Sequence, residues 1–202
     1  LYNPLMDFGP TSADGRTLFM WPRGFPLEFV HDERTARRLR PYGGKAGNGG
    51  GTDVNVKDAA IIQSLADHNP DVDAIYRMTR ELPATFAAPR GAPVAVLPAG
   101  TYTPLNAQAT LWRGNAIWGL LLPTTVSSRV SDIWRGYIAQ RLMVEFVTPS
   151  GAPLRAAISP ALVQQLRNPH SYLSDTRAEV ELYTRSSELL GALASWRRDP
   201  TH

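Results

Sequence analysis

The sequence predicts an α/β fold with short strands and a mostly helical C-terminal tail. Two short apolar segments, "PVAVLP" and "ATLWRG", are bounded by proline or glycine, which is typical of strands. The segment "VSSRVSDIWRGYIAQRL" (126–142) places its apolar residues along one side of a helix, with Ser131 as the expected N-cap. Ser159-Pro160 combines a cap with a proline at the first helical position, so the chain is expected to be mostly helical from residue 159.

Further elements are predicted between and after these segments. An apolar stripe through "DAAIIQSLADH" predicts a helix that starts at Asp58. After the Asn69-Pro70 turn, residues 74–78 are expected to form a strand, and "MVEFVTP" (143–149) is expected to form another. The later helix should pack through five side chains: Val180, Tyr183, Leu190, Leu193 and Trp196.

Three segments are predicted to be loops or solvated surface. The prolines of "WPRGFP" favour a rigid extended loop (21–26). The charged segment "HDERTARRLR" (31–40) is expected to be a solvated, helix-compatible face. The glycine-rich segment 43–53 is expected to be a loop, and it lacks the residues that complete a phosphate-binding P-loop.

Composition narrows the class of protein. The chain has 202 residues, of which 43% are hydrophobic and 19% charged, which suits one domain or one domain with an appendage. Disulfide frameworks and thiolate metal sites are excluded because cysteine is absent. Nearly all positive charge is arginine, which binds carboxylates and phosphates with two parallel hydrogen bonds. These arginines are dispersed among 18 acidic residues, so nucleic-acid binding is not expected.

Two places in the sequence carry acidic residues that could bind a metal or take part in catalysis. Asp71 and Asp73 form an Asp-x-Asp pattern, which either holds a divalent metal or belongs to a turn, and we favour the turn. Asp132 near the start of a helix, with Arg135 three residues later, is either a helix cap with an ion pair or a catalytic carboxylate with a cation. No histidine metal site is expected, because four histidines are scattered singly: His31, His68, His170 and His202.

Four blocks resemble the STELLO-type glycosyltransferases of the plant and algal Golgi. In chain order these blocks are "WPRGFPLE", "SLADHNPDVDAIYRMTR", "LPAGTYTPLNAQATLW" and "AIWGLLLPTTVSSRVSDIWRGYIAQRL". The same blocks are distantly similar to the reversibly glycosylated proteins, which are UDP-arabinopyranose mutases. The resemblance implies a partial nucleotide-sugar glycosyltransferase (GT-A-like) fold.

The resemblance also implies roles for individual residues. Asp132 would be the base or acceptor-orienting carboxylate, and Arg135 a catalytic cation beside it. For substrate binding the resemblance implies Arg23, Asn106 and Trp112, and we add Arg129 as a further cation and Trp134 as an aromatic surface for a sugar ring. Trp21, Trp112 and Trp134 could stack on sugar rings, although core packing is the simpler expectation for most of them. Mn²⁺ or Mg²⁺ would belong to the full-length protein, whose acidic cluster lies upstream of the "WPRG" block, and no metal is expected to bind this chain alone.

Domain organisation follows from the same comparison. Residues 1–147 resemble the C-terminal half of a glycosyltransferase-like domain, and residues 148–202 a mostly helical tail. Three explanations of the missing donor half stay open: the chain is part of a longer one, another chain supplies that half, or the domain is a non-catalytic scaffold or subunit. The expected partners are a nucleotide sugar, a carbohydrate or protein acceptor and a protein complex. The expected location is the Golgi lumen, in synthesis of cell-wall polysaccharide.

Overall fold

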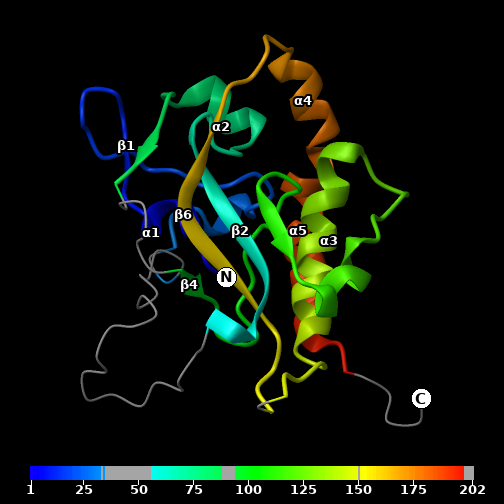
Figure 1. Cartoon of the computed structure of the whole chain (residues 1–202). Helices are drawn as coiled ribbons and strands as arrows, with labels where there is room; N and C mark the ends of the chain where they lie inside the picture. The colour runs from blue at the N-terminus through cyan, green and yellow to red at the C-terminus, as the bar shows by residue number, and fades with distance from the viewer. Residues whose placement is uncertain (33, 35–55, 88–93, 150, 198–202) are drawn as a thin grey trace.

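A four-stranded mixed sheet forms the centre of the protein (Figure 1). The computed structural model describes residues 1–32, 34, 56–87, 94–149 and 151–197. Two long parallel strands, β2 (Ala59–His68) and β6 (Arg155–Gln165), lie side by side in the sheet. Two short strands flank them antiparallel, with β4 (Ala95–Val96) beside β6 and β5 (Thr110–Trp112) beside β2. The α/β class and the strands in "PVAVLP" and "ATLWRG" are therefore confirmed.

The segment from Asp58 to His68 is a strand, so the predicted helix is wrong. Only Val56–Asp58 is helical, as the short 3-10 turn η2, and β2 follows it. The run Ala59–Ile61 is fully buried. A central strand that is covered on both faces carries a continuous apolar run, and such a run also fits a buried helix. The parallel pairing with β6 stabilises the strand in place of the helix.

The predicted strand over residues 74–78 is instead a helix, α2 (Ala74–Thr79). Its N-cap is Asp73, whose carboxylate accepts a hydrogen bond from the backbone N–H of Tyr76 at 2.7 Å. An N-cap aspartate satisfies a backbone donor that the first helical turn would otherwise leave open. This cap signal outweighed the apolar composition of the segment.

Ser159 and Pro160 lie inside β6 rather than at the start of a helix. The pairing of β2 with β6 shifts register between Ser64 and Ala66, opposite these residues. Proline is tolerated at such an irregularity because no ladder hydrogen bond is required there. The hydroxyl of Ser64 bridges the gap, donating to the carbonyl of Pro160 and accepting from the N–H of Leu162.

The tail becomes helical only after β6. It forms α4 (Tyr172–Ala178) and α5 (Val180–Ser195), so the later helix is confirmed. Its buried apolar side chain is Leu182, whereas Val180 and Trp196 are exposed. The expected packing residues Leu190 and Leu193 lie partly buried against α3, and so does Leu189, which the sequence did not single out.

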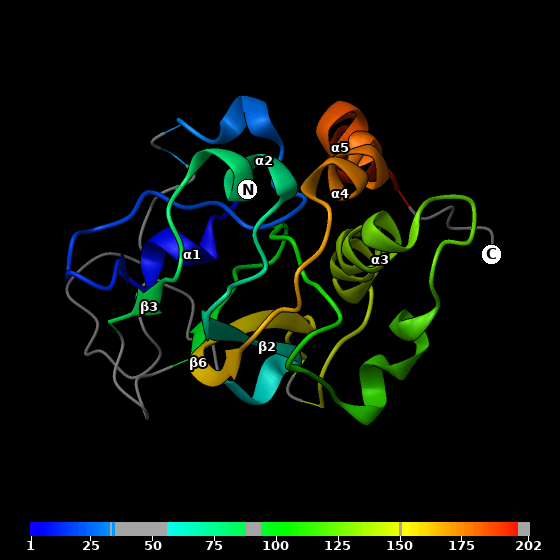
Figure 2. The ribbon, with the colours of Figure 1, turned by 90° about the horizontal axis from the view of Figure 1, so that it is seen from above.

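The long helix α3 (Ser128–Met143) confirms the central prediction from the motif at 126–142. It begins after Ser127 rather than after Ser131, which places Asp132 beyond the first turn. It lies between the main sheet and α5, as Figure 2 shows. The segment "MVEFVTP" is not a strand, because α3 ends at Met143 and only Val147 forms an isolated bridge, with Pro153.

The "WPRGFP" loop is anchored on α3. Gly24 has a φ of +82°, and a Cβ placed there would lie 2.4 Å from Ile133 of α3. The hydroxyl of Tyr137 donates a hydrogen bond of 2.9 Å to the carbonyl of Gly24. Glycine is required here because it alone combines this backbone conformation with so close an approach. The loop conformation predicted from the prolines is confirmed, and its glycine fixes Arg23 beside the helix.

Smaller elements complete the chain. A two-stranded antiparallel sheet joins β1 (Pro10–Thr11) to β3 (Thr85–Phe86). The remaining short helices are α1 (Pro4–Asp7), η1 (Leu27–Phe29) and η3 (Gly114–Leu120). Among the described residues, no helix has the length and apolar character needed to cross a bilayer. The glycine-rich loop 43–53 and most of the charged segment 31–40, namely residue 33 and residues 35–40, lie outside the described residues.

Candidate functional site

A cavity of about 440 Å³ lies at the carboxyl ends of β2 and β6. Its volume falls within the range of roughly 300–1,000 Å³ that is common for small-molecule sites. Open α/β sheets bind ligands at this edge, because the loops that follow parallel strands converge there. The position and size of the cavity make it the candidate site.

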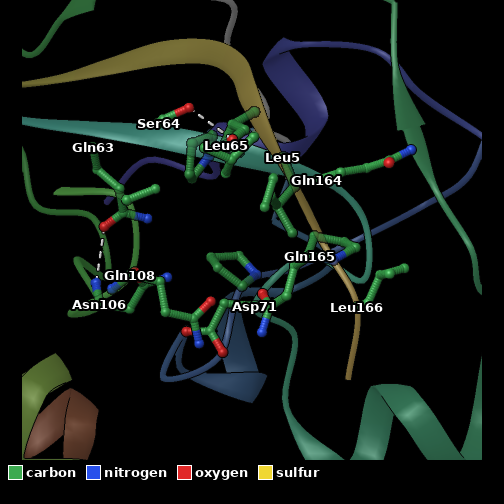
Figure 3. A pocket seen from close by; sticks show the side chains of 16 residues that line it. Leu5, Gln63, Ser64, Leu65, Asp71, Asn106, Gln108, Gln164, Gln165 and Leu166 are labelled. Carbon is green, nitrogen blue, oxygen red and sulfur yellow. Dashed lines mark hydrogen bonds between the residues drawn. The ribbon is translucent and has the colours of Figure 1, made fainter. Parts of the chain in front are cut away.

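The cavity wall is rich in amide side chains. In Figure 3, Gln63 and Asn106 lie on one side of the hollow and Gln165 and Leu166 on the other, with Asp71 below. The Oε1 atom of Gln63 accepts a hydrogen bond of 2.8 Å from the backbone N–H of Asn106, which ties the loop before β5 to the sheet. The described lining residues are Pro4, Leu5, Pro22, Gln63, Ser64, Leu65, Ala66, Pro70, Asp71, Asn106, Gln108, Ala109, Val163, Gln164, Gln165 and Leu166.

Arg23 lies behind this wall and binds two carboxylates at once. Its Nη2 atom lies 2.9 Å from an oxygen of Asp71 and 2.9 Å from an oxygen of Asp132. Its Nε and Nη1 atoms provide a second contact to each, so both pairings are bidentate, and Nη1 also donates to the carbonyl of Arg129. Such planar paired hydrogen bonds are the strongest that arginine makes with carboxylates. The Asp71–Arg23–Asp132 triad therefore joins the cavity to α3.

The triad is largely removed from solvent. The exposed fractions of the side chains are 5% for Arg23, 6% for Asp71 and 13% for Asp132. Burial acts to lower the pKa of Arg23, but the two carboxylates outweigh it and raise the pKa above its usual value. Burial likewise acts to raise the pKa of Asp71, but the charge of Arg23 outweighs it and holds the pKa below its usual value. Arg23 and Asp71 are therefore ionised together near neutral pH.

Asp132 points towards the loop before β5. One of its oxygens accepts a hydrogen bond of 3.1 Å from the backbone N–H of Ala107, beside Asn106. Asp132 is not among the described residues that line the cavity, whereas Asp71 and Asn106 are. Among the described ion pairs it binds Arg23 rather than Arg135, so the expected helix pair three residues apart does not form. Of the residues predicted from the sequence, Arg23, Asp132 and Asn106 thus come together.

Arg135 and Trp112 form a separate pair. The guanidinium carbon of Arg135 lies 5.0 Å from the centre of the Trp112 ring, a cation–π distance. Arg135 is 6% exposed, and its Nε and Nη2 atoms have no hydrogen-bond partner among the described residues. Burial lowers the pKa of Arg135, and Asp132 partly offsets this. Neither side chain lines the cavity at the strand ends, as far as the described residues show.

Arg129 and Trp134 connect α3 to the C-terminal helices. Arg129 binds the fully buried carboxylate of Glu179 through its Nε atom at 2.7 Å. The indole N–H of Trp134 donates a hydrogen bond of 3.3 Å to the hydroxyl of Ser186 in α5. Both predicted substrate-binding residues therefore make contacts within the fold. Trp21 is also buried, and its indole N–H donates to Asp73 at 2.7 Å.

The carboxylates of the Asp-x-Asp pattern do not form a metal site with each other. Asp71 is paired with Arg23, and Asp73 caps α2 and binds Trp21. Within the described ranges, no three histidine or acidic side chains gather closely enough to hold a metal ion. A divalent cation needs several free oxygen ligands, which these two carboxylates do not provide. The residues present therefore do not fit the Mn²⁺ or Mg²⁺ that the resemblance implies for a longer protein.

Asp73 gives the protein a distinct pH dependence. Burial, together with the nearby Glu179, raises the pKa of Asp73 to about 6 from a usual 3.8. Between these values the folded protein binds a proton that the unfolded chain does not, so stability falls as pH rises towards and through 6. The Asp73→Asn variant has no such carboxylate. We expect its free energy of unfolding to rise relative to wild type between about pH 5 and 7.5.

Urea denaturation of both proteins at these two pH values checks this expectation. Asp71→Asn provides the matched comparison, because the pKa of Asp71 is lowered and the group is ionised in both states over this window. The difference in free energy of unfolding between Asp71→Asn and wild type should therefore be the same at both pH values. A constant difference for Asp73→Asn as well would show that Asp73 does not titrate here.

Sequence reasoning found part of the site and missed the cavity wall. Asn106 was expected and lines the cavity, whereas Gln63, Gln108 and Gln165 were not singled out. A lone glutamine carries no motif, and these three come from separate segments of the chain. The Asp-x-Asp pattern favours a turn at Asp71, although an aspartate close to the end of a buried strand is a usable signal for this edge of a sheet.

Comparison with known proteins identifies relatives along nearly the whole chain. No protein-family model matches it. The chain is 33% identical to "Probable glycosyltransferase STELLO2" of Arabidopsis thaliana over 203 residues, which cover 96% of this chain. It is 31% identical to "Probable glycosyltransferase STELLO1" of the same plant over 206 residues, or 98% of this chain. In both cases the chain spans only 22% of the relative's length.

These matches bear on the family and on the fold. They extend across β2, α3 and β6 and so include the cavity and the triad. The mixed α/β structure is consistent with part of a glycosyltransferase-like fold. The similarity to reversibly glycosylated proteins stays an expectation from the sequence. By sequence, the chain is therefore a relative of the STELLO-type probable glycosyltransferases, as the four blocks indicated.

Proposed function

We propose that the chain forms the acceptor side of a glycosyltransferase, which transfers a sugar from a nucleotide sugar to a carbohydrate or protein acceptor. One observation carries the proposal: the cavity at the strand ends is sized for a sugar, and a buried carboxylate triad supports it. The names of the two relatives support the same reaction class. Because the chain spans 22% of those relatives, the donor side is assigned to the remainder of a longer protein or to a partner.

The reaction requires a proton acceptor near the attacking hydroxyl. The acceptor oxygen forms a bond to the anomeric carbon, the bond to the nucleoside diphosphate breaks, and the hydroxyl proton passes to a base. Asp132 is the proposed base or orienting carboxylate. Arg23 and the N–H of Ala107 hold it in a fixed position, which supports an orienting role in particular.

Cations that face a departing diphosphate are also part of the proposal. Arg135 keeps two buried N–H groups without partners among the described residues, which supports a role towards an anion. Arg129 has weaker support because Glu179 already neutralises it. Trp112 contacts Arg135 and Trp134 contacts Ser186, which supports a role of both side chains in positioning α3. The Golgi location and the cell-wall product rest on the family resemblance alone.

Filling the cavity tests the function. Ala66 lines the cavity from β2, so Ala66→Phe in the full-length protein should lower sugar transfer from UDP-sugars by about tenfold or more, since a steric block removes productive binding. Transfer is measured as release of UDP in the presence of acceptor. Leu162→Phe is the control, because Leu162 is 59% exposed on β6 and is not among the described lining residues. Equal activity of both variants, or no transfer by wild type, would contradict the proposal.

A further inference from the structure

We propose that the cavity is a subsite for an uncharged sugar ring of the acceptor, and that Asp71 makes it select against uronic acids. The inference rests on the proposed function and names the acceptor's chemical class. It is drawn from the atoms that line the cavity rather than from α3. Asp71 thus becomes a specificity-determining residue, a role distinct from that of Asp132, the proposed base or orienting carboxylate.

The polar groups of the wall match the hydroxyls of a sugar. The Oε1 atom of Gln165 is buried and has no hydrogen-bond partner among the described residues. Buried hydrogen-bond acceptors are rarely left without a hydrogen-bond donor, so a ligand hydroxyl would satisfy this atom. Amides both donate and accept hydrogen bonds, and a carboxylate accepts them, as hydroxyl recognition requires. Gln108 contributes a further neutral polar side chain at the same cavity.

The charge of the wall separates neutral from anionic sugars. Asp71 is the one charged side chain among the described lining residues. A ligand carboxylate beside it would be buried next to a like charge without a cation in the wall, which is unfavourable. Arg23 already binds both carboxylates of the triad. The negatively charged diphosphate of a nucleotide sugar would be repelled by Asp71 in the same way. The subsite is therefore assigned to the acceptor sugar rather than to the donor.

Two further arginines, Arg77 and Arg167, lie near Asp71. Arg77 is buried and donates hydrogen bonds to Asn69 and to the carbonyl of Pro70. Arg167 follows Leu166, a lining residue just beyond the end of β6, and its Nη1 atom is buried without a partner among the described residues. Neither is among the described lining residues. If they reached the ligand, an anionic sugar would be preferred instead.

A matched pair of glycosides tests the selectivity. Methyl β-D-glucopyranoside and methyl β-D-glucopyranosiduronate share one ring and differ by a hydroxymethyl group against a carboxylate. Each is titrated into the full-length protein and followed by ligand-observed NMR. We expect the neutral glycoside to bind about tenfold more tightly than the uronate, or about 1.4 kcal/mol. Equal binding, or tighter binding of the uronate, would overturn the inference.

Asp71→Asn should weaken binding of the neutral glycoside about tenfold, because a hydrogen bond to a charged acceptor is lost. The same variant should remove the discrimination against the uronate. Unchanged discrimination in a folded variant would overturn the role of Asp71. Asp14→Asn is the control, because Asp14 is an exposed aspartate paired with Arg16.

Gln165→Met provides a second variant that does not disturb the triad. This substitution removes a buried hydrogen-bond acceptor that has no partner among the described residues, so stability should be unchanged or slightly higher. Binding of the neutral glycoside should fall. Loss of binding without loss of stability is the result that a merely structural glutamine would not give. Leu162→Met introduces the same side chain on β6, outside the described lining residues, and should leave binding unchanged.

The titrations do not depend on turnover. If the neutral glycoside binds with the expected selectivity but UDP is never released, the subsite stands and the transferase function fails. If UDP is released but the pair of glycosides shows no selectivity, the function stands and the inference fails. Binding of UDP alone with loss of the glycoside signal would assign the cavity to the donor and overturn the acceptor subsite.

Discussion

Replacing Arg23 with methionine is expected to lower the free energy of unfolding by about 3–5 kcal/mol, because a buried ion pair that loses one partner leaves uncompensated charge. Here two carboxylates, Asp71 and Asp132, would lose their shared cation at once. Methionine retains much of the length of the arginine side chain, so the loss reports charge rather than packing. Denaturation in urea at neutral pH measures the change.

Arg16→Met is the matched control. Arg16 also binds two carboxylates, Asp14 and Glu81, but its side chain is 63% exposed. Exposed ion pairs contribute roughly 0–1 kcal/mol, so this variant should differ little from wild type. Similar losses for both variants would mean that the Arg23 triad does not stabilise the fold in the way the contacts indicate.

Asp132→Asn in the full-length protein is expected to lower sugar transfer by ~10²–10⁴, the usual contribution of a positioned acid or base. The loss of thermal stability should be small. Asparagine has the same shape, its oxygen can accept from Arg23 or Ala107, and Asp71 still neutralises the guanidinium. Steady-state rates of UDP release, together with thermal unfolding, measure both quantities.

Asp175→Asn is the control for this prediction, because Asp175 is a similarly buried carboxylate that faces Arg129 and lies outside the triad. It should keep most of the transfer activity. A pH–rate profile distinguishes a base from an orienting group, since only loss of a base removes the acidic limb of the profile. Unchanged transfer by Asp132→Asn would remove Asp132 from the catalytic machinery.

Local signals predicted the parts of the fold that local interactions determine. The stripe of apolar residues in 126–142 predicted α3, and bounded apolar runs predicted β4 and β5. The errors at β2 and β6 have one cause. These two strands pair with each other across about 90 residues, and no local pattern records that partner. The error at α2 was avoidable, since Asp73 is a recognisable N-cap.

The candidate site, like the fold, could be predicted only in part from the sequence. The family resemblance selected Arg23, Asn106 and Asp132, and the structure brings these residues together. The sequence did not indicate that Asp71 shares Arg23 with Asp132, because the three residues come from a loop, a turn and a helix far apart in the chain. Their convergence depends on Gly24, which lets the loop approach Ile133.

The central claim is that a sugar hydroxyl binds in the cavity beside Asp71. A crystal structure of the full-length protein with methyl β-D-glucopyranoside tests it most directly. We expect the ring at the carboxyl ends of β2 and β6, with one hydroxyl within hydrogen-bond distance of Asp71 and another of Gln165. A ring bound elsewhere, or a cavity closed by side chains of the remaining chain, would contradict the claim.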